Sequence, residues 1–169
     1  MTATYEKIAT TTLSSTASTF TFSSISGSYT DLVLIGNLGG SVANNSCKIQ
    51  FNSDTGTNYS LTEIQGNGTT ASTRRISNNA YAYFSYDTAP STAIEFVGIF
   101  QINNYSNTTT YKTYLSRANG AHAAASPGTS ATVGLWRNTS AINRLDITMS
   151  SGNLITGSTF TLYGILKAA

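Results

Sequence analysis

Residues 51–60, FNSDTGTNYS, contain the triplet Asp-Thr-Gly at positions 54–56. In aspartic proteases this triplet forms the catalytic loop, and two copies bring together two aspartates that hold different pKa values. Here polar residues precede Asp54, which predicts a wet position, and no second triplet is present, although a homodimer would supply one. The alternative is a turn, with Asp54 as a side-chain cap and Gly56 at positive φ. We favour the turn.

Few other side chains could perform catalysis or bind a metal. The single histidine, His122, lies in an Ala-rich segment, and the single cysteine, Cys47, lies in an expected strand as a small buried thiol. Two such residues at no recognisable spacing do not supply the ligands of a metal site. Glu63 and Glu95 lie far apart, so paired-carboxylate glycosidase chemistry has no support. A Ser-His-Asp arrangement from distant positions stays open, but no Gly-x-Ser-x-Gly elbow is present.

Neither a phosphate-binding P-loop nor a dinucleotide-binding glycine motif occurs in the sequence. We therefore expect a protein that is not an enzyme, with no catalytic residue, no cofactor and no metal.

The tyrosines are the better candidates for binding. Ten are present, and several lie in or beside expected loops. In 79–86, NAYAYFSY, two tyrosines share the face opposite Phe84, so they point outward if Phe84 is in the core. Rings with a polar tip suit protein–protein contacts and stacking on sugars, whereas the alternative is that they cover the sandwich edge or pack under loops. The candidates for partner or glycan contacts are Tyr59, Tyr81, Tyr83, Tyr105 and Tyr111.

The composition is that of a neutral, hydroxyl-rich chain. Charged residues make up 9% of the 169 residues, against about 25% in an average soluble domain. The basic residues are scattered apart from Arg74-Arg75, which argues against nucleic-acid binding. The first thirteen residues lack the features of a secretory signal, and no apolar run approaches the length of a membrane span, so we expect synthesis in the cytoplasm. Low charge also removes repulsion between copies and thereby favours assembly.

Period-two alternation dominates the elements that must position these residues. The strongest is 93–102, in which Phe96, Phe100 and Ile102 share a face. Clusters of Gly, Asn, Asp and Pro separate the segments, which is typical of an all-β protein. We predict a single domain over 1–169, an antiparallel jelly-roll-like β-sandwich of about ten short strands. The predicted strands lie within 5–13, 18–23, 31–37, 47–52, 79–86, 93–102, 111–117, 131–137, 144–150 and 159–166.

Several stretches together resemble a family of small virion structural proteins of marine tailed phages, including phages of cyanobacteria. The resemblance runs from about Tyr5 to the end of the chain, and three segments carry most of it: FNSDTGTNYS, NYSNTTTYKT and GSTFTLYGI. It implies a β-sandwich that assembles on the virion. The decorated head, a head fibre and the tip of a tail fibre all stay open as its place.

We therefore expect a capsid-decoration or head-fibre protein, made in the host cytoplasm and located on the virion. Its expected partners are further copies of itself, as a trimer, and the major capsid protein or other virion proteins. The terminal segments, 5–13 and 159–166, are candidates for strand exchange between neighbours. The alternative is a tail-fibre or receptor-binding module that recognises host surface glycans through the candidate tyrosines.

Overall fold

The computed structural model describes residues 4–43, 45–86, 95–120 and 128–166. These residues form β-strands and no helix. The Ala-rich segment that contains His122 falls almost entirely outside the described residues. The strands are β1 (Tyr5–Thr12), β2 (Thr19–Phe22), β3 (Asp31–Leu38), β4 (Cys47–Phe51), β5 (Tyr59–Gly66), β6 (Ala71–Asn79), β7 (Ala82–Ser85), β8 (Phe96–Asn103), β9 (Lys112–Gly120), β10 (Thr129–Trp136), β11 (Leu145–Met149) and β12 (Thr159–Ile165).

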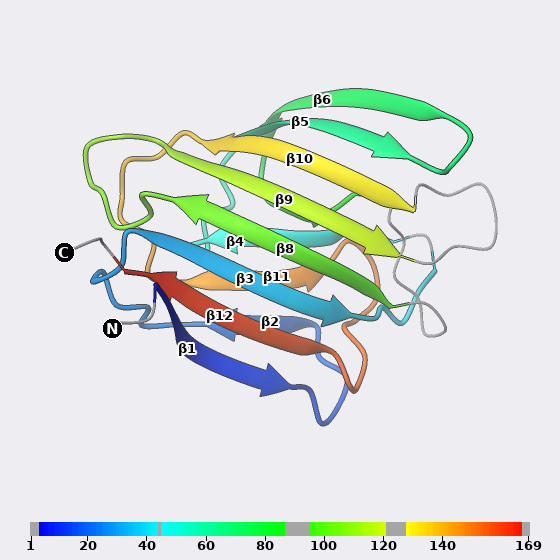
Figure 1. Ribbon diagram of the computed structural model, residues 1–169, viewed down its shortest axis with the longest axis horizontal. Helices are drawn as coiled ribbons and strands as arrows, with labels where there is room; N and C mark the ends of the chain where they lie inside the picture. The colour runs from blue at the N-terminus through cyan, green and yellow to red at the C-terminus, as the bar shows by residue number, and fades with distance from the viewer. Residues whose placement is uncertain (1–3, 44, 87–94, 121–127, 167–169) are drawn as a thin grey trace.

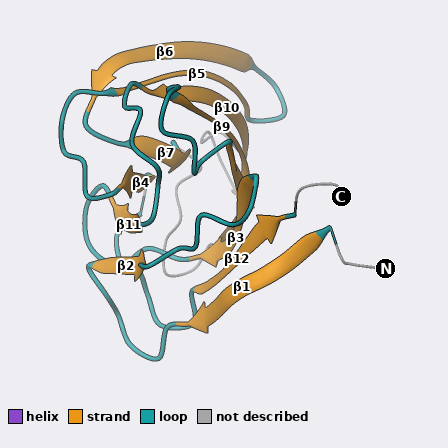
Figure 2. Cartoon of the chain, turned by 90° about the vertical axis from the view of Figure 1, so that its left-hand side faces the viewer, coloured by secondary structure: helices purple, strands orange, loops and turns teal. Residues whose placement is uncertain are grey.

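The strands pack as two sheets, one in front of the other in Figure 1. Eight strands make the larger sheet, in the order β1-β12-β3-β8-β9-β10-β5-β6, and four make the smaller sheet, in the order β2-β11-β4-β7. Every neighbouring pair is antiparallel. The larger sheet curves around the smaller one (Figure 2). The fold is a jelly-roll-like antiparallel β-sandwich, so the predicted fold class is confirmed.

Ten of the twelve observed strands correspond to the segments predicted from period two. The two missed strands are the hairpin β5–β6. On β5 the inward positions include the carboxylate of Glu63, and on β6 they include the guanidinium of Arg74, so the apolar alternation fails. The two groups form an ion pair at 3.2 Å between Arg74 Nε and Glu63 Oε2. A strand whose inward side chains are charged is therefore missed by a prediction that relies on alternating apolar residues.

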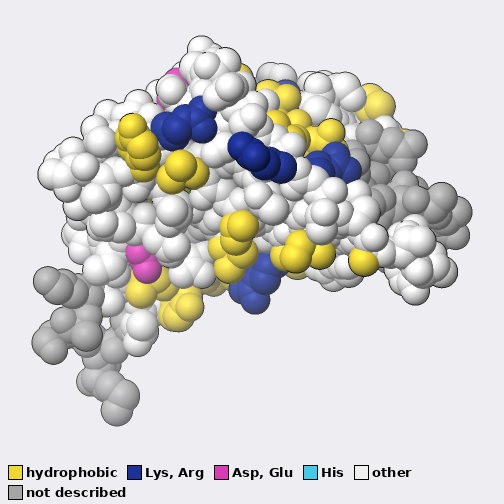
Figure 3. Space-filling view, turned by 90° about the horizontal axis from the view of Figure 1, so that it is seen from above, with side chains coloured by type: hydrophobic (Ala, Val, Ile, Leu, Met, Phe, Trp, Pro, Cys, Tyr) yellow, Lys and Arg dark blue, Asp and Glu magenta, His cyan; other side chains and the backbone are white. Residues whose placement is uncertain are grey.

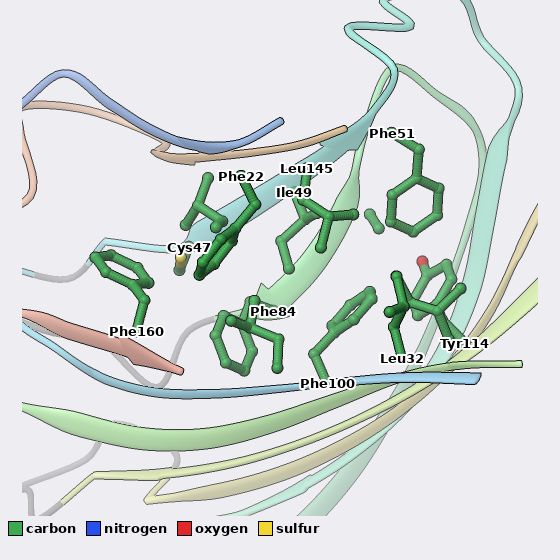
Figure 4. Close-up of a cluster of buried hydrophobic side chains, with 14 of the residues drawn as sticks. Phe22, Leu32, Cys47, Ile49, Phe51, Phe84, Phe100, Tyr114, Leu145 and Phe160 are labelled. Atoms are coloured by element: carbon green, nitrogen blue, oxygen red, sulfur yellow. The ribbon is translucent and has the colours of Figure 1, made fainter. Parts of the chain in front are cut away.

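A trough of small residues crosses the inner face of the larger sheet. Gly36, Gly98 and Ala118 are register partners on β3, β8 and β9. The ring of Phe84, from β7 of the smaller sheet, fills this trough and is fully buried (Figure 4). A Cβ atom built on Gly98 would lie 2.6 Å from that ring, so only glycine leaves room for it. The trough therefore fixes how the two sheets lie on each other.

The edges of the larger sheet are β1 and β6. The β1 pairing shifts between Lys7 and Ala9, and β6 carries two adjacent arginines. Bulges and charged side chains of this kind discourage the addition of a further strand. Of the two terminal strands, β1 lies at an edge, whereas β12 is paired on both sides, with β1 and β3; strand exchange between neighbours stays a prediction.

Candidate functional site

The Asp-Thr-Gly stretch is a turn between β4 and β5. The Asp54 carboxylate accepts hydrogen bonds from the Gly56 amide at 2.8 Å, from Asn58 Nδ2 at 2.9 Å and from the indole Nε1 of Trp136 at 2.7 Å. The prediction of an aspartate cap is confirmed, but that of a positive φ at Gly56 is wrong. The positive φ angles fall on Asn52 and Ser53 instead. A Cβ on Gly56 would lie 2.8 Å from Asn58 Nδ2, so a larger residue there would displace a side chain that donates to Asp54.

The electrostatics of Asp54 do not suit a protease dyad, in which one carboxyl group holds a raised pKa. Burial acts to raise the pKa of Asp54, but the hydrogen bonds from Asn58, Trp136 and Gly56 outweigh it, so the pKa lies below its ordinary value. At Asp146, burial is likewise outweighed by the hydrogen bonds of Arg144, Thr21 and Ser53, and the pKa is lowered. Both carboxylates stabilise local structure in their charged form.

A loss of stability in acid follows from these two groups. Because both folded-state pKa values lie below the unfolded value of about 3.9, their stabilisation is complete above about pH 5 and is lost as the pH falls through the folded pKa. We expect Asp54→Asn to be less stable than wild type at neutral pH but to lose less stability on acidification. Thermal unfolding across this pH range measures both effects, and an identical pH dependence in the variant would contradict this role of Asp54.

Two of the five candidate tyrosines are core residues. Tyr59 and Tyr105 have no exposed surface, so the expectation that they face a partner is wrong. The hydroxyl of Tyr59 accepts a hydrogen bond from the Phe51 amide at 2.9 Å, and the hydroxyl of Tyr105 donates to the carbonyl of Ser26. Burial raises the pKa of both phenols. A tyrosine in a loop can be buried beneath that loop when its hydroxyl forms a hydrogen bond with a backbone group.

The other three candidates differ from one another. Tyr111 is exposed, Tyr81 is half-buried and Tyr83 is buried. Tyr81 and Tyr83 do share a face, but Tyr83 also packs edge-on against Tyr86, with ring centroids 4.5 Å apart. Lys48 Nζ lies 4.6 Å from the centre of the Tyr81 ring. The expectation that Tyr83 is displayed outward is wrong, because neighbouring rings cover it.

The remaining sequence candidates offer no reactive centre. Cys47 is fully buried, as predicted, and burial raises the pKa of its thiol. Glu95 is exposed just before β8. Within the described ranges no group of three or more metal-ligating side chains occurs. The same residues contain no helix that is long and apolar enough to span a membrane.

The most unusual surface is the outer face of the larger sheet, which we call the outer face. Four aliphatic side chains on it are exposed to 38–60% of their full surface. Register pairing aligns one row of outward residues directly across five strands. The exposed aliphatic residues are Ile35, Ile64, Val97 and Val133. The aligned row is Ile35, Ile99, Arg117, Ala131 and Ile64.

A shallow groove of about 580 Å³ lies on the outer face, over β8, β9, β10 and β5. Its walls include Ile64, Val97, Ile99 and Arg117, and the small side chain of Ala131 leaves room between them. A second hollow of about 340 Å³ lies over β10, β5 and β6, beside Val133. Extended aliphatic surface of this kind is typical of sites that bind another molecule.

Sequence reasoning missed the outer face, although one signal was present. The segment 31–37, DLVLIGN, is apolar on both faces, which is typical of a strand that is buried on both sides. Its inward residues, Leu32 and Leu34, are in the core, whereas Ile35 points outward and is exposed. Whether such outward apolar residues gather on one exposed face can be recognised only when the sheet order is known.

No protein-family model and no curated protein matches the sequence. Among solved structures, the chain is similar to the galectin LEC-6 of Caenorhabditis elegans, at 10% identity and a TM-score of 0.38, over 94% of this chain and 96% of the galectin. It is also similar to a protein of unknown function from Shewanella oneidensis, at 12% identity and a TM-score of 0.20, over 85% of this chain and 62% of that one. A third similarity is to infectious bursal disease virus, Gt strain, at 13% identity and a TM-score of 0.13, over 94% and 41%. These similarities concern the fold and carry no information on what this chain binds.

Proposed function

We propose that the protein is a non-enzymatic structural component of a phage virion, which decorates the capsid or forms part of a head fibre and holds a neighbouring virion protein through the outer face. The observation that carries the proposal is the exposed aliphatic surface of Ile35, Ile64, Val97 and Val133 on a chain with few charges. Burying such side chains against a neighbour removes apolar surface from water, which favours association.

The arrangement of the larger sheet favours binding by its face over binding by its edges. The edge strands β1 and β6 carry a bulge and charged side chains, which act against strand addition. The outward aliphatic residues lie instead on the inner strands β3, β8, β10 and β5. In this proposal the outer face holds the major capsid protein or another virion protein, and the chain also associates with further copies as a trimer.

Recognition of host glycans has less support. It needs exposed rings on which sugars can stack, but Tyr59, Tyr83 and Tyr105 are buried. Tyr111 is exposed by itself, at 53% of its surface, and Tyr81 is only partly accessible.

The proposal is tested on phage particles. We expect particles without the protein to lose DNA at a lower temperature and in milder osmotic shock than complete particles. We also expect Val133→Asp to lower the copy number on the particle at least tenfold, because the carboxylate would be buried without a partner. Quantitative electrophoresis of purified virions measures the copy number.

Thr19→Asp is the matched control, since Thr19 is exposed on the smaller sheet, opposite to the outer face. A protein that is absent from wild-type virions would overturn the proposal. Equal occupancy of both variants would show that the outer face is not the contact.

A further inference from the structure

The charges on the outer face are all of one sign over five strands. The outward positions of β8, β9, β10, β5 and β6, all of them described, include Arg75 and Arg117 and no Asp or Glu. Arg137 follows directly after β10 and lines the same surface. Glu63 on β5 points inward, Asp31 lies at the start of β3, and Glu95 lies before β8. Figure 3, a view from above, likewise shows hydrophobic groups beside Lys and Arg with few acids.

Arg117 is the central residue of this surface. Its register partners are Ile99 on β8 and Ala131 on β10, so aliphatic side chains flank the guanidinium on both sides. The structure records no hydrogen bond or ion pair for Arg117 with any described residue. The 580 Å³ groove lies beside it. A guanidinium next to an apolar groove is suited to a group that combines a carboxylate with an apolar side chain.

The second hollow repeats the same combination. Arg75 and Arg137 both line it, together with Val133 and Leu135. Arg137 is held in place by hydrogen bonds from Nη2 to the Thr57 carbonyl at 2.7 Å and to Asn78 Oδ1 at 3.0 Å. Two hollows on one face therefore each place an aliphatic wall beside an arginine.

We infer that the outer face binds a protein segment that is both apolar and acidic, with its apolar side chains in the groove and a carboxylate on Arg117. The inference rests on the proposed function, because it names the chemistry of the neighbour that this face holds. Electrostatic complementarity of this kind selects partners and speeds their association.

A second copy of the chain is the less suitable occupant. Two outer faces packed on each other would bring arginines of equal sign together, which disfavours a symmetric face-to-face pair. Nucleic acid is also less suitable, since its phosphates need a cluster of cations, whereas Ile64, Val97 and Val133 present exposed aliphatic surface. The self-association predicted above would then use another surface.

The test uses two synthetic helical peptides of about 15 residues, long enough to form a helix. One contains only Leu, Ala and Glu, and the other carries Lys in place of every Glu. We expect the Glu peptide to bind the full chain at least tenfold more tightly than the Lys peptide, as measured by fluorescence anisotropy. Added salt should weaken this preference because the charges are exposed.

Two variants locate the site. We expect Arg117→Gln to weaken binding of the Glu peptide at least fivefold and to leave the Lys peptide unaffected, whereas Ile64→Ser weakens both. Thr19→Ser, on the smaller sheet, is the control with no effect, and all three variants should keep the wild-type melting temperature, because the positions are exposed.

Equal binding of the two peptides, no binding, or full binding by Arg117→Gln would each overturn the inference. Tighter binding of a duplex DNA oligonucleotide than of the Glu peptide would identify a phosphate-binding face instead. A dimer in analytical ultracentrifugation that Ile64→Ser dissociates would identify a self-interface. If the peptide experiment fails while the protein is present on virions, the proposed function stands and only the partner chemistry is wrong.

Discussion

Replacing Phe84 with alanine is expected to lower the free energy of unfolding by about 3–5 kcal/mol, the usual cost of removing a buried aromatic ring. The ring is fully buried and packs edge-on against Phe96 and Phe100, with centroids 5.5 Å and 5.8 Å away. Its removal leaves the trough at Gly36 and Gly98 empty, since glycines have no side chain that could move into the space. Chemical denaturation measures the effect.

Tyr111→Ala is the control for Phe84→Ala, because it removes an aromatic ring of similar size from an exposed position. We expect a change within about 0.5 kcal/mol for this variant. A loss below about 1 kcal/mol for Phe84→Ala would mean that the two sheets close over the trough, which the paired backbones of β3 and β8 should prevent.

The second large effect is expected for Trp136→Ala, at about 3–5 kcal/mol. Trp136 is fully buried, and its ring lies 5.4 Å from Phe51 and 6.2 Å from Tyr59, measured between centroids. Its indole also donates the hydrogen bond that ties the Asp54 turn to β10. The variant therefore removes both a piece of the core and the link between the turn and the larger sheet.

Trp136→Phe separates these two contributions, because it keeps most of the ring and loses the indole N–H. We expect it to cost about 1.5–3 kcal/mol, the value of a hydrogen bond to a charged group. In a double-mutant cycle, Asp54→Asn should cost less in the Trp136→Phe background than in wild type. Strictly additive losses would contradict the direct coupling of Asp54 and Trp136.

Much of the fold was predictable, because a strand with one face in the core has a simple period. Phe96, Phe100 and Ile102 all occupy even-numbered positions, and the structure buries all three on one side of β8. The pattern fails where a charge points inward, as Glu63 does on β5. The ion pair with Arg74 satisfies that charge, but the partner is on another strand, so a single segment does not reveal it.

The candidate site was less predictable, since exposure depends on what lies above a residue in space. Tyr105 lies in a loop by sequence, yet its ring is buried and its hydroxyl reaches the carbonyl of Ser26, 79 positions away. Ile64 and Val133 belong to adjacent strands of the sheet but lie far apart in the chain. An outer face made of such residues becomes visible only after register is known.

The pairing of β1 with β12 has a consequence for the order in which the chain folds. Thr10 and Thr161, which are hydrogen-bonded through their hydroxyls, lie 151 positions apart, and β2 finds its partner only in β11. On a ribosome, the first two strands therefore emerge long before the strands that receive them. Contacts of such high sequence separation slow folding to milliseconds or seconds. The central strands β8, β9 and β10, which pair with close neighbours in sequence, are then the natural place for the structure to start.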